Sequence, residues 1–192
     1  RVLIDGEDIN WATLESLRAE TLLVGGSEPW YTGTILENIT GGDSRYSLGQ
    51  ATEAAKMVHA HNFIQKFPQG YETTIGEHGD QLGGVQGFLL ALARAMMRDP
   101  ALLIIEEPSL EMTDDEKDHL EDAFRRAATG RPTIVQPSRI STLRNVDRIV
   151  LLSRGKVEVV GTHDLLLKKS ALYRHWEYMQ FNEFRHEISP IQ

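Results

Sequence analysis

Apolar residues along the chain fall into two patterns that predict two kinds of element. Residues 21–24 (TLLV), 101–105 (ALLII) and 148–152 (RIVLL) form short continuous apolar runs, which are typical of buried strands. Residues 85–98 form a longer apolar stretch, which exceeds the length of a strand and predicts a buried helix. Further strands are expected at 133–135 and at 157–160, the latter forming a hairpin with 148–152. This alternation of strands and helices predicts an α/β fold.

Polar residues and glycines indicate where the remaining helices begin and end. Asn10 is placed to cap a helix over 10–18, and Gly130 ends a charged helix that runs from Asp114 to Thr129. Further helical stretches are expected at 34–39, 48–67 and 162–188, with a glycine-rich loop at 68–84. We therefore expect a helical subdomain over 34–98 within the α/β fold, and a C-terminal helix and tail over 170–192.

Composition excludes several classes of function. The 28 acidic residues exceed the 20 basic ones, and a net charge of -8 argues against a nucleic-acid surface, which needs a basic face. The sequence contains no cysteine, so disulfide frameworks and zinc-thiolate sites are excluded. Its apolar runs are too short to predict a membrane span. Because the chain opens on Arg1 inside an apolar run, we expect it to be a piece of a longer protein.

Two adjacent acids stand directly after a predicted central strand. Glu106 and Glu107 follow the apolar run 101–105, and ligand sites in parallel sheets lie at the carboxyl ends of the strands. Two carboxylates at such a place can hold Mg²⁺ or polarise a water molecule. The alternative is that both are solvated acids at the end of a strand.

The order of four sequence blocks matches a known family. The blocks are GTILENI (33–39), GYETTIGEHGDQLGGVQ (70–86), ALARAMMRDPALLIIEEPS (91–109) and DRIVLLSRGKVEVVGTHDLL (147–166). Together they resemble the nucleotide-binding domain of ATP-binding cassette (ABC) transporters of the exporter type. The resemblance implies a P-loop NTPase-like ABC ATPase fold, with residues 1–192 as a partial domain. It also implies ATP and Mg²⁺ as cofactors, and a place at the cytoplasmic face of the membrane. The implied partners are a transmembrane domain and a second nucleotide-binding domain, in a homodimer or a heterodimer.

The phosphate loop of that family is missing from the 192 residues. A GxxxxGKS or GxxxxGKT pattern cradles phosphates with backbone N–H groups and a lysine, and no such pattern occurs here. The only Gly-Lys pair is Gly155-Lys156, and Val157 follows it. In the family this loop and its strand precede the segment that begins here at Arg1, and the strand lies between those that match 133–135 and 148–152. We therefore expect an incomplete central sheet with a gap at that place.

Two further motifs of the family are altered. The glutamine that links metal, water and the membrane domain corresponds to Gly26, or to Glu28 if the alignment shifts by two positions. The signature, LSGGQ in the family, corresponds to Leu82, Gly83, Gly84, Val85 and Gln86. Gly83 lacks the hydroxyl that would bind the partner's γ-phosphate, and Val85 adds two methyl groups where the family keeps glycine for close approach. The alternative is a glycine-rich turn that only caps a helix.

The resemblance assigns roles to the strand-end acids and to two later positions. Glu106 stands at the position of the metal-binding aspartate and is one methylene longer, while Glu107 stands at the position of the catalytic base. Thr113 replaces an aspartate that contacts the opposite active site, and Ser138 replaces the switch histidine. Serine reaches less far than imidazole and carries no charge. The resemblance thus implies degenerate catalytic motifs and a chain without activity on its own.

One block keeps the family pattern. Residues 74–79 resemble the exporter segment that contacts the intracellular helices of the membrane domain, although a plain glycine-rich loop is the alternative. Three functions follow from these comparisons: a domain of an ATP-coupled exporter, a catalytically inactive structural or regulatory partner, or a related ATPase of DNA repair. The exporter-like blocks and the acidic net charge disfavour the third.

Overall fold

The computed structural model describes residues 1–4, 6–25, 30–77 and 79–188, and the side chains up to Met179 within the last range. The described chain divides into two units, Arg1–Gln136 and Pro137–Gln192. Each unit is described by itself below.

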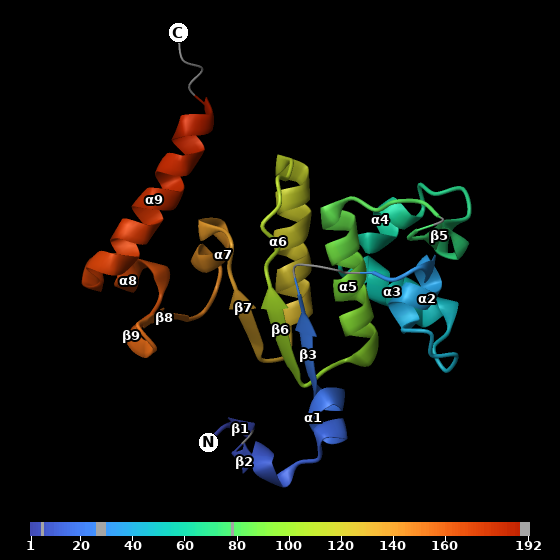
Figure 1. Cartoon of the computed structure of the whole chain (residues 1–192), viewed down its shortest axis with the longest axis horizontal. Helices are drawn as coiled ribbons and strands as arrows, with labels where there is room; N and C mark the ends of the chain where they lie inside the picture. The colour runs from blue at the N-terminus through green and yellow to red at the C-terminus, as the bar shows by residue number, and fades with distance from the viewer. Residues whose placement is uncertain (5, 26–29, 78, 189–192) are drawn as a thin grey trace. The chain divides into compact units, whose positions relative to one another are not determined.

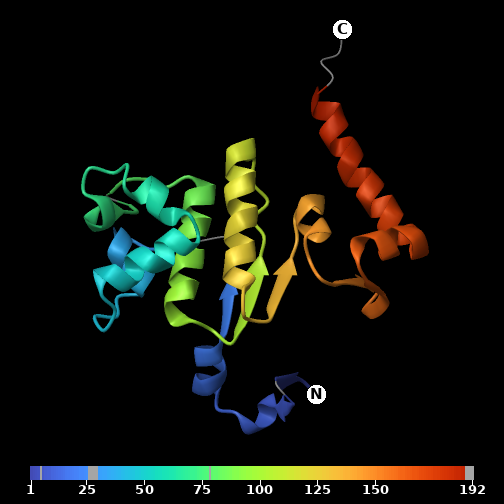
Figure 2. The same ribbon diagram turned by 180° about the vertical axis from the view of Figure 1, so that it is seen from behind.

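The first unit is built on a parallel sheet of three strands. Its strands are β3 (Thr21–Val24), β6 (Leu102–Glu106) and β7 (Thr133–Gln136), in the order β3-β6-β7. All three predicted strands are confirmed to within one residue at each end. The helices α5 (Gly84–Arg98) and α6 (Asp114–Ala128) pack on each other, and α6 lies behind the sheet in Figure 1 and in front of it in Figure 2.

The two faces of this sheet differ in exposure. Val24, Leu103 and Ile105 are buried in one cluster with apolar residues of α5 and α6. Leu23 and Ile134 lie on either side of Ile104 in the sheet register. Their neighbours along the strands are buried or half-buried, but Leu23 and Ile134 are 65% and 57% exposed. One face of the sheet is therefore covered by helices, and the described residues leave apolar side chains exposed on the other.

Short helices form a block beside α5. They are α2 (Ile35–Thr40), α3 (Leu48–Met57) and α4 (Ala60–Ile64). Thr34 and Ser47 begin α2 and α3 with capping boxes, which satisfy free N–H groups at each helix start. The continuous helix expected over 48–67 is wrong, because His59 adopts a left-handed backbone conformation (φ 63°) and separates α3 from α4.

The connections of this block contain a second, smaller sheet. A 3₁₀ turn, η2 (Gly70–Glu72), leads into β5 (Thr74–Ile75), which pairs antiparallel with β4 (Gly33–Thr34). The loop expected over 68–84 thus contains a short strand that joins it to the start of α2.

The N-terminal helix begins later than the sequence predicted. The hairpin of β1 (Leu3–Ile4) and β2 (Glu7–Asp8) leads into a 3₁₀ turn, η1 (Ile9–Trp11), and then into α1 (Leu14–Glu20). Asn10 does not cap α1. It lies inside the 3₁₀ turn and donates its N–H to Asp8, while Thr13 accepts the capping hydrogen bond from Ser16.

The second unit, as far as it is described, contains a hairpin and three helices. The strands β8 (Ile149–Ser153) and β9 (Lys156–Gly161) pair antiparallel, as expected. The helices are α7 (Ile140–Arg144), α8 (His163–Lys169) and α9 (Ala171–Ile188), so the helical stretch expected over 162–188 divides near Ser170. Among the described residues β7 pairs with β6 and β8 pairs with β9, in separate sheets. None of the described helices has the length and hydropathy that crossing a membrane requires.

Candidate functional site

The two strand-end acids occupy different environments. Glu106 pairs with Gln136 at the end of β6, and the backbone N–H of Glu107 donates to the Gln136 carbonyl oxygen at 3.0 Å. Side chains alternate along a strand, so Glu106 is exposed while Glu107 is only 4% exposed. Glu107 is therefore not a solvated acid, as one alternative supposed, whereas Glu106 is. The described part of the chain contains no cluster of three or more histidines and acids able to hold a metal ion, so the metal role of Glu106 stays a prediction.

The signature segment forms the start of α5. Gly83 precedes the helix, and its N–H donates to the Gln86 side-chain oxygen at 3.0 Å. The backbone of Gly83 lies in the extended region, and an added Cβ there would meet only Gln86 Oε1, at 3.7 Å. A Cβ on Gly84 would instead lie 2.8 Å from Leu110 Cδ1. A side chain at position 84 would therefore displace the end of the exposed, flexible Leu110 side chain, whereas position 83 accepts one without such a shift.

The apolar members of the signature face inward. Leu82 and Val85 are buried within the main hydrophobic cluster. The two extra methyl groups of Val85 thus pack in the core, and they do not extend over the surface where a partner's nucleotide was expected to approach. The Gln86 side chain caps the N-terminus of α5. This segment therefore begins a helix, which is all that the alternative of a helix-capping turn requires.

Three other predicted positions are described one by one. Gly26, and Glu28 as its alternative, lie outside the described residues. Ser138 lies between β7 and α7, half-buried, and is described as part of the second unit. Thr113 caps α6: its hydroxyl oxygen accepts the N–H of Glu116 at 3.3 Å, and Glu116 Oε2 accepts the N–H of Thr113 at 2.9 Å. The threonine at this position has a local role that its place in the family motif did not suggest.

The segment that keeps the exporter pattern is a tight loop. The Asp80 N–H donates to the Thr74 carbonyl oxygen at 2.9 Å, which closes the loop over 74–80. A Cβ on Gly79 would lie 2.2 Å from the same oxygen, so only glycine fits at that place. Glu77 is exposed near the middle of the loop. The loop therefore presents a carboxylate on a backbone that hydrogen bonds hold in shape.

A buried polar cluster around Asn38 was missed by the sequence analysis. The Asn38 side-chain oxygen accepts the Tyr31 N–H at 2.9 Å and Arg94 Nη2 at 3.1 Å. Its amide nitrogen donates to the carbonyl oxygens of Tyr31 and Thr34, at 2.9 and 3.0 Å. The guanidinium of Arg94 also lies over the Tyr31 ring, 5.2 Å from its centroid. Asn38 thereby joins the segment before β4 to α2 and α5.

Burial shifts the pKa values of two groups in this cluster. It also identifies the sequence feature that could have predicted the cluster. Burial lowers the pKa of the Arg94 guanidinium and raises the pKa of the Tyr31 hydroxyl. Asn38 is fully buried between Ile35 and Ile39 on the apolar face of α2. A polar residue on such a face needs buried partners, and that requirement was the available sequence signal.

Comparison with known proteins places this geometry in context. The chain matches no protein-family model. It is 37% identical over 175 residues to the putative multidrug export ATP-binding/permease protein YgaD of Bacillus subtilis, covering 91% of this chain and 30% of that protein. It is also 37% identical over 173 residues to ABC transporter B family member 19 of Arabidopsis thaliana, covering 90% of this chain and 14% of that protein.

A solved structure gives the same result for the fold. A bacterial Atm1-family ABC exporter with ATP bound matches with a TM-score of 0.82 and 32% identity, over 92% of this chain and 31% of that one. The chain is homologous to the nucleotide-binding domains of ABC exporters. The mixed α/β fold with its parallel sheet accordingly matches the ABC ATPase domain of the Atm1-family exporter. The chain spans less than a third of the length of each of these three proteins.

Proposed function

We propose that this chain is the nucleotide-binding domain of an ABC exporter, in which its catalytic motifs are degenerate. The parent protein couples ATP and Mg²⁺ to export across the membrane, and this domain lies at the cytoplasmic face. It contacts a transmembrane domain and a second nucleotide-binding domain. The observation that carries the proposal is the homology over about nine-tenths of the chain, together with the shared fold.

Altered positions support the degeneracy. Ser138 stands in the place of the switch histidine, and the Thr113 side chain is used to cap α6. Gly83 offers no hydroxyl at the start of α5. Few of the groups that bind phosphate and position water in this family are therefore available in this chain.

A second function is a catalytically inactive structural or regulatory partner of an active ABC ATPase domain. It is favoured by the contrast between the altered catalytic positions and the loop over 74–80, which keeps the exporter pattern and a hydrogen-bonded shape. The two functions differ in the parent protein, since an intact phosphate loop there favours the first.

Titration of the purified chain with Mg-ATP tests whether these 192 residues bind nucleotide by themselves. Most of the affinity for a triphosphate comes from the phosphate-loop amides and lysine, so we expect no appreciable binding. A dissociation constant of about 100 µM or tighter, roughly 5.5 kcal/mol, would contradict the degeneracy.

A restoration experiment tests whether the remaining motifs are active. An intact strand and phosphate loop are joined to the chain, and the rate of ATP hydrolysis is measured. We expect no turnover, because Glu107 has no switch histidine to act with. The changes Ser138→His, Gly26→Gln and Glu106→Asp are then introduced together. Hydrolysis before these changes would show that the motifs are competent as they stand.

Coupling to the membrane domain is tested separately. We expect the contact to run through 74–79 and the helical block at 34–67. Glu77→Lys should weaken co-purification with the parent membrane domain and leave the fold intact, because an exposed loop charge contributes little to packing. Glu15→Lys, at an exposed position of α1, serves as the matched control. Equal co-purification of both variants would count against the assignment of this loop.

A further inference from the structure

One side of α9 presents an apolar stripe to solvent. Leu172, Trp176 and Met179 are spaced by four and three residues, so they lie along one line of the helix. Their side chains are 41%, 36% and 48% exposed within the described part of the chain. The stripe extends over two helical turns, or about 10 Å. Exposed apolar residues that gather in one place mark an interaction site more often than isolated ones do.

The opposite side of α9 is used within the second unit. Tyr173 is fully buried, and His163 Nδ1 lies 2.8 Å from its hydroxyl oxygen. One turn further along α9, Glu177 Oε1 lies 3.5 Å from Arg144 Nη2 and 3.7 Å from His163 Nε2. These contacts hold the first turns of α9 in place within their unit. A partner can therefore cover only the side that carries the stripe.

Trp176 is the central member of the stripe and is supported from within the unit. The centroid of its ring lies 6.4 Å from that of Tyr173, with an angle of 49° between the two rings. This contact restricts the tryptophan ring and leaves part of it open. Tryptophan is enriched among the residues that dominate the binding energy of protein interfaces, because it offers a large and rigid surface. We therefore expect Trp176 to be the anchor of this surface.

Basic side chains accompany the stripe. Residues 168–179 contain Lys168, Lys169 and Arg174, and their only acid is Glu177, which is engaged on the opposite side of α9. Lys168 and Lys169 lie in the last turn of α8, directly before α9, and both are exposed. Neither forms an ion pair with an acid that the structure describes. Both ammonium groups are therefore available to the acidic groups of a partner.

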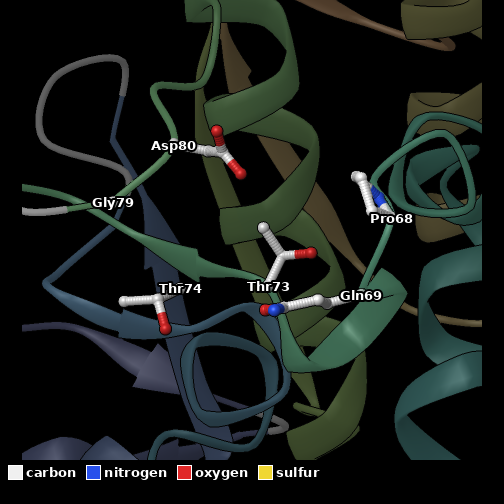
Figure 3. A pocket seen from close by; sticks show the side chains of 6 residues that line it. All are labelled: Pro68, Gln69, Thr73, Thr74, Gly79 and Asp80. Carbon is white, nitrogen blue, oxygen red and sulfur yellow. The ribbon is translucent and has the colours of Figure 1, made fainter.

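The two units of the chain differ in the sign of their charge. Of the 28 acidic and 20 basic residues, 22 and 11 belong to Arg1–Gln136, which gives this unit a net charge of -11. Figure 3 shows one of these acids, Asp80, at the cavity beside the loop over 74–80. The remaining six acids and nine basic residues give Pro137–Gln192 a net charge of +3. An acidic partner is therefore attracted to the second unit and repelled by the first.

We propose that the stripe on α9 binds an acidic amphipathic helix of another protein. Leucines on one side of such a helix cover Trp176 and its two neighbours in the stripe, and its carboxylates reach Lys168 and Lys169. A second copy of this chain fits less well, because its residues 168–179 offer the same basic groups and an acid that is already engaged. The proposal concerns the second unit alone and requires neither a nucleotide nor a membrane domain.

The test uses a fluorescently labelled synthetic peptide and the full chain of 192 residues. The peptide has about four helical turns, with leucines spaced by three and four residues and glutamates between them. We expect saturable binding in fluorescence anisotropy with a dissociation constant of about 100 µM, because a stripe of two turns is smaller than a standard interface. The same peptide with lysines in place of the glutamates should bind about fivefold more weakly or worse. Equal binding of both peptides, or no saturable binding of either, would overturn the proposal.

Variants of tryptophan test the anchor. Trp176→Ala should weaken binding of the acidic peptide about tenfold, because it removes the central side chain of the stripe. Trp11→Ala is the matched control, since Trp11 is 87% exposed in η1 and should not affect the affinity. Circular dichroism of both variants checks that the fold is kept. Equal affinities of the two variants would show that the peptide does not bind at the stripe.

Charge variants test the basic groups and do not alter the apolar side chains of the stripe. Lys168→Glu combined with Lys169→Glu should weaken binding about fivefold and reduce its dependence on salt. Arg154→Glu combined with Lys156→Glu makes the same change of charge at exposed positions of the β8–β9 hairpin and should have a smaller effect. An affinity that the two lysine changes leave unaltered would overturn the proposal.

Two other occupants of the stripe give different results. If a second copy covers it, sedimentation velocity shows self-association that Trp176→Ala reduces, and the acidic peptide does not bind. If a lipid surface covers it, the chain co-sediments with vesicles of phosphatidylcholine and phosphatidylglycerol, Trp176→Ala reduces this, and again the peptide does not bind. Either result would overturn the assignment of an acidic helix.

Discussion

The imidazole Nε2 of His59 lies 2.6 Å from Oδ2 of Asp122, although the two residues are 63 positions apart in the sequence. His59 stands at the corner between α3 and α4, and Asp122 lies on α6. Asp122 also contacts Arg125 and Arg126 of its own helix. The hydrogen bond from His59, with further help from these arginines, holds the pKa of Asp122 below its ordinary value. This contact ties the block of short helices to the helix that covers the sheet.

The variant Asp122→Asn should lower the free energy of unfolding by about 1 kcal/mol at pH 7, the upper range for a partly exposed pair. Folding favours the ionised form of Asp122, because its pKa is lowered. Its contribution is therefore complete above the ordinary pKa of an aspartate, about 4, and is lost as the pH falls through the lowered pKa. Urea unfolding of both proteins at several pH values measures this. Asp118→Asn, at an exposed position of α6, is the control and should have no effect. A difference that grows toward acid pH would contradict the sign.

The variant Asn38→Ala should lower the free energy of unfolding more than Asp122→Asn does. It removes the hydrogen-bond partners of the Tyr31 N–H and of Arg94 in a buried place, and each unpaired buried group costs about 1–3 kcal/mol. We expect the free energy of unfolding to fall by about 3 kcal/mol in urea titrations. Asn62→Ala, at an exposed position of α4, changes the same side chain without this cluster and should cost less than about 0.5 kcal/mol. Similar losses in both variants would show that the cluster adds no stability.

The two signature glycines should respond differently to substitution. Gly83→Ser fits the backbone and places a good capping residue before α5. The free energy of unfolding should therefore stay the same or rise by about 0.3 kcal/mol. Gly84→Ala should be the less favourable change, because its Cβ would lie 2.8 Å from Leu110 Cδ1, but its cost should stay within about 0.5 kcal/mol because the exposed Leu110 side chain can move. Thermal unfolding of both variants measures the contrast, and the reverse order would exclude the packing described here.

The exposed face of the sheet should promote self-association. Leu23 and Ile134 flank Ile104 in register, and their exposed side chains form an apolar row that a second molecule can cover. The double change Leu23→Thr and Ile134→Thr places β-branched residues at both strand positions and should weaken association by about tenfold or more, as judged from the apolar area lost. Sedimentation velocity over a range of concentrations measures it. Leu14→Thr alters an exposed leucine of α1 and should leave the association unchanged.

Much of the fold was predictable because its elements follow local rules. The strands at 21–24, 101–105 and 133–135 are short runs rich in apolar and β-branched residues, which favour strands even though one face of this sheet is exposed. The helix over 85–98 is confirmed because its length and apolar content leave few alternatives. The acids at the end of β6 were found for the same reason, since a strand that runs into two carboxylates is visible in the sequence alone.

The sequence by itself thus determined the type and order of the elements and the positions of the family motifs. The tertiary structure alone decided the left-handed turn at His59, the opposite exposure of Glu106 and Glu107, and the close approach of Leu110 to Gly84. It also decided the contacts of Asn38 with Arg94 and of His59 with Asp122, whose members are 56 and 63 positions apart. The physical reason is range: periodicity and capping act over a few residues, whereas burial and pairing depend on which distant segments the folded chain brings together.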